Sequence, residues 1–168
     1  MLKNFKNMIS EYFTTFPPEA RLWIFMGERS FSPEEEKFID EKLNNFLPEW
    51  NAHGKEMKAE FKILYHQFIV LVADESFTVA SGCSIDSLTR VFKSLEQDLN
   101  LKLTNRMLIP FKADDKIETL TLKAFSQAVK NKEISSETIV FDNSVANLQD
   151  FRQKWELPLA QSWAKKFL

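Results

Sequence analysis

Residues 57–73 have the sequence MKAEFKILYHQFIVLVA, and this stretch decides the expected fold. Its first part, 57–65, alternates apolar and polar residues, which is typical of a strand at a sheet edge with one solvated face. Its second part, 68–73, is continuously apolar, as in a strand that is covered on both faces. A tight turn at 65–67 must join them, although it contains neither Gly nor Asn. The stretch therefore predicts an edge strand followed by a central strand.

A second apolar run and a capped helix precede this pair of strands. Residues 22–26 (LWIFM) are apolar without alternation, which indicates another central strand. Ser32 is then placed as an N-cap, Pro33 as the first helical residue and Glu35 as the partner that completes a capping box. We expect this helix to end near His53-Gly54, where glycine can take the left-handed capping conformation. Its predicted buried face consists of Phe38, Ile39, Leu43, Phe46, Leu47 and Trp50.

A helix and a fourth strand follow. Residues 84–99 carry apolar side chains at helical spacing, and 106–112 form a short apolar strand that contains Pro110. Because proline cannot donate to a ladder, we expect this strand at an edge. The order β-α-β-β-α-β, with the first and third strands central and the second and fourth at the edges, predicts an α+β fold with a ferredoxin-like core.

The remaining residues extend this core at both ends. An amphipathic helix is expected at 3–16, so residues 1–112 form the predicted core with its N-terminal helix. Residues 113–168 form a C-terminal α/β extension. Its expected elements are strands at 119–122 and 138–141 and helices at 122–131, 145–155 and 158–167. These pieces are too few to bury a core alone, so we expect them to pack on the first unit and not to form an independent domain.

Composition limits the possible environments and partners. The 168 residues are 44% hydrophobic, include 16 Phe and 4 Trp, and carry a formal charge of −2. This charge gives no electrostatic footprint for nucleic acid. No apolar run approaches the ~20 residues that span a bilayer. The single cysteine, Cys83, excludes an internal disulfide, and no Asn-x-Ser/Thr acceptor occurs, so a soluble protein of the reducing cytoplasm is expected.

Three stretches, YHQFIVL at 65–71, SGCSIDS at 81–87 and PLAQSW at 158–163, resemble an uncharacterised family from Bacteroidetes-type bacteria. The resemblance extends over nearly the full length. Members of that family often carry the label "ABC transporter ATPase", but the family brings no established activity, cofactor or catalytic residue.

The residues themselves contradict that label. A P-loop needs G-x-x-x-x-G-K-[ST], so that backbone amides can surround the phosphates. The three glycines here, Gly27, Gly54 and Gly82, are isolated and more than twenty residues apart. One Cys and two separated His do not form the usual zinc arrays, and no G-x-S-x-G elbow is present. No metal and no cofactor is therefore expected.

One segment remains as a candidate site because it follows a central strand and leads into a helix. The first turn of a helix presents free amides and a positive dipole end. On the predicted topology, Arg21, His53 and Lys112 lie at the same end of the sheet and supply positive charge or a base, whereas Arg29 and His66 lie at the opposite end. The candidate ligand-binding residues of the segment are Ser81, Gly82, Cys83, Ser84, Asp86 and Ser87.

Three interpretations of this segment stay open. It is a helix start capped by Ser84 or Cys83, with Cys83 as a small buried hydrophobe; or it binds an anion or small ligand; or Cys83 is a nucleophile whose thiol pKa is lowered by the helix. The leading hypothesis is a non-catalytic binding or interaction protein, with a protein partner or a homodimer possible. The alternative is a thiol-dependent enzyme that uses Cys83, assisted by Arg21 or His53.

Overall fold

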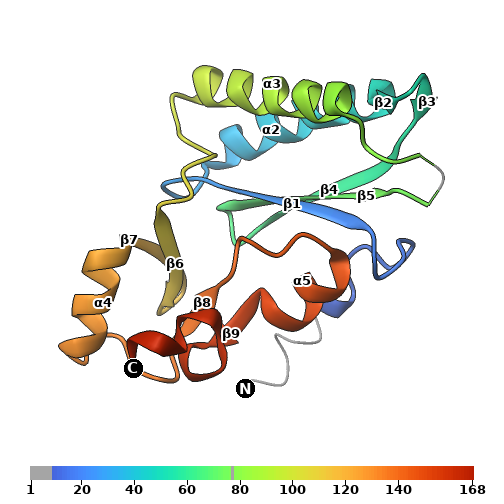
Figure 1. Cartoon of the computed structure of the whole chain (residues 1–168). Coiled ribbons are helices and arrows are strands. Elements are labelled where there is room, and N and C mark those ends of the chain that lie inside the picture. Colours follow the sequence, from blue (N-terminus) through green and yellow to red (C-terminus); the bar gives the residue numbers. More distant parts are fainter. Residues whose placement is uncertain (1–8, 77) are drawn as a thin grey trace.

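A computed structural model describes residues 9–76 and 78–168, which form a mixed α+β fold with two main antiparallel sheets (Figure 1). The first sheet has three strands in the order β1-β5-β4. They are β1 (Arg21–Met26), β4 (Lys58–Leu64) and β5 (Phe68–Asp74). Every residue of β5 is buried, which confirms the continuously apolar run as a central strand, and β4 is an edge strand as predicted.

Two helices cover one face of this sheet. Helix α2 (Pro33–Phe46) and helix α3 (Gly82–Leu99) lie together above the strands in Figure 1. Alternate residues of β5, namely Ile69, Leu71 and Ala73, point toward them, because successive side chains of a strand face opposite sides. Phe25 of β1 stacks on Phe92 of α3 with ring centroids 3.4 Å apart. This layer is the first part of the core.

The opposite face of the sheet is covered by the N-terminal segment and by helix α5 (Leu148–Lys154). Ile9, Phe13 and Phe16 are buried there against Val70 and Val72 of β5. Residues 3–8 of the predicted N-terminal helix lie outside the described part of the chain. Within the described part the helix is shorter than predicted, because Phe13 takes a φ of 58° and so leaves the right-handed helical region.

The second sheet has four strands in the order β7-β6-β8-β9. Helix α4 (Leu122–Lys130) packs on this sheet through Phe125 and Val129. These two side chains belong to one buried cluster with Ile109 and Val140 of the sheet. The strands are β6 (Leu108–Ala113), β7 (Lys116–Thr121), β8 (Ile139–Phe141) and β9 (Glu156–Pro158).

The predicted fourth strand is β6, and its predicted place is wrong. Instead of flanking β1, it pairs with β7 through the tight Asp114-Asp115 turn and with β8. A local hairpin closes a much shorter loop than a pairing with β1, so its entropic cost is smaller. Pro110 is therefore in an inner strand, where the pairing with β8 is limited to Phe111 and Val140. The ferredoxin-like core is not confirmed, and β1 is an edge strand instead of a central one.

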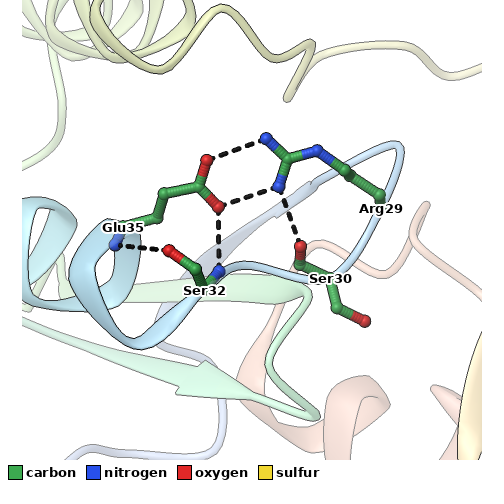
Figure 2. Close-up of polar contacts among 4 residues, drawn as sticks. All are labelled: Arg29, Ser30, Ser32 and Glu35. Atoms are coloured by element: carbon green, nitrogen blue, oxygen red, sulfur yellow. Dashed lines mark hydrogen bonds and ion pairs between the residues drawn. The ribbon is translucent and has the colours of Figure 1, made fainter.

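The start of α2 confirms the predicted capping box. The Ser32 Oγ accepts from the Glu35 amide at 3.2 Å, and Glu35 Oε2 accepts from the Ser32 amide at 2.8 Å. Figure 2 shows these two contacts and those of Arg29. Arg29 adds two hydrogen bonds of 2.8 Å to the same carboxylate. Together these hydrogen bonds lower the pKa of Glu35 to about 2, and the bond from Arg29 makes the largest contribution. The helix thus begins with three donors on one carboxylate.

Several predicted ends and elements differ from the structure. Helix α2 ends at Phe46 and not near His53-Gly54, because Pro48 has no amide to continue the ladder. Gly54, with φ +75°, instead turns a two-strand hairpin. The predicted final helix at 158–167 is replaced by β9 and two 3₁₀ turns. The short elements are η1 (Leu47–Glu49), β2 (Asn51–Ala52), β3 (Lys55–Glu56), η2 (Leu159–Gln161) and η3 (Trp163–Phe167).

Replacing Glu35 with Gln is expected to lower the free energy of unfolding at pH 7 by about 1 kcal/mol at most, because Arg29 is half exposed to solvent. The glutamine oxygen can still accept from Ser32, so the substitution removes the charge and one of the two acceptors for Arg29. The folded-state pKa of Glu35 is below its usual 4.5, so the charge stabilises the fold above that value. The difference between the two proteins should shrink as the pH falls from 4.5 toward 2.

Urea unfolding of both proteins across that pH range measures this difference. Glu34→Gln is the matched control, since Glu34 is an exposed first-turn carboxylate on the same helix. A Glu35→Gln difference that stays constant with pH would contradict the assigned ion pair.

Candidate functional site

The predicted segment at the start of α3 is organised by its own serines. Ser81 is the N-cap, and its Oγ accepts from the Ser84 amide at 3.2 Å. Ser84 Oγ donates to the Ser81 carbonyl, and Ser87 Oγ donates to the Ser84 carbonyl, both at 2.8 Å. The prediction that Ser84 or Cys83 caps the helix is therefore wrong. All three hydroxyls make hydrogen bonds to the first turns of their own helix.

The other residues of this segment face solvent. Gly82, Cys83 and Asp86 are exposed, so the interpretation of Cys83 as a small buried hydrophobe is wrong. Among the described residues, no atom lies within 4 Å of a Cβ built on Gly82, so the structure does not require glycine there for space. Within the same part of the chain, no hydrogen bond or ion pair reaches the Cys83 thiol. The segment is an open surface.

Two of the three predicted basic partners lie at this end of the first sheet. Arg21 Nη1 is 3.5 Å from Glu75 Oε1, and that oxygen accepts from the Ala80 amide at 3.0 Å, so Arg21 contacts the loop that leads into α3. His53 is exposed in the β2–β3 turn. That hairpin follows Trp50, whose Nε1 donates to the Ser84 carbonyl at 2.9 Å. Arg29 and His66 lie at the opposite end, as predicted, where the His66 carbonyl accepts from the Phe31 amide.

The predicted position of Lys112 is wrong, because β6 belongs to the second sheet. Its Nζ donates to Glu156 Oε1 at 2.5 Å and to Tyr65 Oη at 3.2 Å, and Tyr65 is in the β4–β5 turn, at the other end of β5 from α3. Tyr65 Oη donates to Glu156 Oε2 at 2.6 Å. Burial, and then the Glu156 carboxylate, raise the pKa of Tyr65 far above its usual value. This cluster joins the two sheets.

Within 9–76 and 78–168, no group of three or more His, Cys, Asp or Glu side chains is arranged to hold a metal ion. No helix in those ranges is both long enough and apolar enough to span a bilayer.

A cavity of about 320 Å³ lies between β1, the segment leading into β6, and the loop that follows β8. None of the residues predicted as site residues lines it. Its apolar walls are formed by Ile24, Met26, Leu108, Pro110, Phe141 and Trp163. Its polar lining consists of Thr104, Asn105, Arg106, Asp142, Asn143 and Ser144. Mostly apolar walls with a few converging polar groups are the usual composition of a small-molecule site.

Some of the polar side chains that line the cavity already make hydrogen bonds within the protein, and others do not. Asp142 Oδ1 accepts from the Ser144 amide at 3.0 Å and from its hydroxyl at 2.5 Å. Asn143 Oδ1 accepts from Trp155 Nε1 at 3.0 Å, which holds the amide in place. Arg106 is exposed, and no described carboxylate lies within 4 Å of its guanidinium. The lining thus combines polar side chains that are fixed by intramolecular hydrogen bonds with one exposed guanidinium that pairs with no described carboxylate.

Comparisons with protein-family models, with curated proteins and with solved structures find no match for this chain. The resemblance to a Bacteroidetes-type family therefore stays a prediction.

Proposed function

We propose that this chain is a non-catalytic, cytoplasmic binding protein whose ligand, a small organic molecule, occupies the cavity between β1 and β6. The cavity itself is the observation that supports this proposal: it is concave, has apolar walls and carries a few polar groups on its rim. Of the described residues that line it, none is His, Cys or Lys. The side chains present are suited to holding a ligand in one orientation.

The ligand position in this proposal differs from the start of α3. At α3 the serine hydroxyls already bond to the helix backbone, and the surface is open. A thiol-dependent enzyme remains the alternative, and the exposure of Cys83 is the observation that favours it. The two proposals place the ligand on different surfaces, so single substitutions distinguish them.

Replacing Leu108 with Trp is expected to abolish binding, because the indole fills the cavity from a partly buried wall position. The measurement is ligand-observed NMR with a library of small organic fragments on the full chain. Fragments that bind the native protein should lose at least tenfold in affinity, which corresponds to about 1.4 kcal/mol. Leu122→Trp is the matched control, since Leu122 is exposed on α4 and does not line the cavity.

Cys83→Ser provides the second control in the same experiment. The proposal requires that this variant bind the fragments like the native protein. If the fragments bind the Leu108→Trp variant with the affinity of the native protein but bind the Cys83→Ser variant more weakly, the binding site lies at the start of α3 and not in the cavity. A library in which nothing binds the native chain would contradict the proposal outright.

A further inference from the structure

The outer edge of β1 is bonded at two points that leave a gap between them. The Leu22 amide donates to the Ala146 carbonyl at 2.9 Å, and the Met26 amide donates to the Leu103 carbonyl at 3.0 Å. In an antiparallel ladder, the backbone groups of alternate residues point to the same side. Ile24 lies midway between these two residues. Its amide and carbonyl therefore also point away from β5, toward the cavity that Ile24 lines.

These two groups of Ile24 have no partner among the described residues. The neighbouring amides, of Leu22 and Met26, are each bonded to a crossing chain, whereas no described backbone or side-chain group bonds to Ile24 on this side. A strand edge with a free donor and a free acceptor pairs with the N–H and the C=O of one extended residue, as in β-strand addition. Because the gap is closed at Leu22 and at Met26, it accommodates one residue and not a long strand.

Of the described residues that line the cavity, Arg106 is the only one with a positive charge. Arg106 presents a planar fork of donors that matches a carboxylate in two-bond geometry. Leu108, Phe141 and Trp163 supply apolar surface beside it.

We propose that the ligand is an N-acylated amino acid with an apolar side chain and a free carboxylate, a chemistry shared by the C-terminal residue of a peptide. Its N–H donates to the Ile24 carbonyl, and one carboxylate oxygen accepts from the Ile24 amide. Its side chain enters the apolar walls, and the other carboxylate oxygen accepts from Arg106. This assignment rests on the proposed binding function and specifies the class of ligand.

The test is a ¹H–¹⁵N NMR titration of the full chain with three probes: N-acetyl-leucine, its methyl ester, and 4-methylpentanoic acid, which lacks the amide. N-acetyl-leucine should bind best and should shift the Ile24 amide resonance and slow its hydrogen exchange. Arg106→Gln should weaken N-acetyl-leucine by about tenfold and leave the ester unchanged. Arg90→Gln is the matched control, an exposed arginine on α3 outside the cavity lining.

The tripeptide Gly-Gly-Leu distinguishes the two sources of this chemistry. Tighter binding than N-acetyl-leucine assigns the site to peptide ends, and weaker binding assigns it to free acylated amino acids. Equal binding of 4-methylpentanoic acid and N-acetyl-leucine, or an Arg106→Gln variant that behaves like Arg90→Gln, would overturn the ligand class. In that case the binding function still stands if Leu108→Trp abolishes binding of other fragments, so the two failures are distinguishable.

Discussion

Trp155→Ala is expected to lower the free energy of unfolding by about 3–5 kcal/mol, the largest effect of any single substitution considered for this chain. Trp155 is fully buried. The distance from the centroid of its ring to the ring centroid is 4.8 Å for Phe151, 4.9 Å for Phe141 and 5.1 Å for Phe68. These three rings come from α5, β8 and β5. The truncation therefore opens a void where the two sheets meet, and leaves the Asn143 oxygen without the indole donor.

Urea unfolding followed by circular dichroism measures this loss, and Trp163→Ala is its matched control. Trp163 is 37% exposed at the cavity wall, so its removal should cost less than half as much. Because domains have a total stability of about 5–15 kcal/mol, Trp155→Ala can fail to fold, and Trp155→Phe then takes its place with a smaller loss. A Trp155→Ala protein as stable as Trp163→Ala would show that this cluster does not hold the sheets together.

The features that could be predicted from the sequence are local ones. The capping box at Ser32 and Glu35 depends on residues three apart, and it forms as expected. The apolar run in 68–73 forms a central strand, because a continuously apolar strand needs cover on both faces. The same pattern in 22–26 belongs to an edge strand, so the pattern alone does not decide which strand is central. The Tyr65-His66 turn forms without glycine, with both residues at φ 53°.

The place of β6 could not be predicted because it depends on competition between distant partners. Its apolar pattern fits either sheet, and β7 and β8 supply closer partners than β1. The outer edge of β1 is instead bonded at Leu22 and Met26 by the 146 and 103 segments, which carry no strand pattern. Because β6 pairs with β7 and β8 and not with β1, the predicted ferredoxin-like strand order is wrong. The same pairing leaves space for the cavity between β1 and β6.

The candidate site follows from the same pairing. Ile24, Arg106 and Asn143 are far apart in the sequence. They line one cavity only because β6 lies in the second sheet and not beside β1. None of them has a motif, and a lone arginine in a loop has no distinctive spacing. The start of α3 was accessible to sequence reasoning because Ser81, Gly82 and Cys83 are contiguous, but contiguity identifies a helix cap as readily as a site.

Glu156→Ala is expected to lower the free energy of unfolding by about 2–4 kcal/mol. The Glu156 side chain is only 7% exposed, and its two oxygens accept from Lys112 Nζ and from Tyr65 Oη. The Lys112 ammonium also lies 4.5 Å from the centre of the Tyr65 ring. Removing the carboxylate deprives the partly buried Tyr65 hydroxyl of its acceptor and removes a negative charge that offsets Lys112.

Three variants separate charge from hydrogen bonding in this cluster. Glu156→Gln keeps an acceptor of the same size, so its loss should be smaller than that of Glu156→Ala. The double variant Lys112→Met with Glu156→Leu should be more stable than Glu156→Ala, because removing both charges also removes the cost of burying them. Glu118→Ala, an exposed glutamate on β7, should change stability by no more than about 0.5 kcal/mol. If Glu156→Ala unfolds at the same urea concentration as Glu118→Ala, the cluster contributes nothing to the junction of the two sheets.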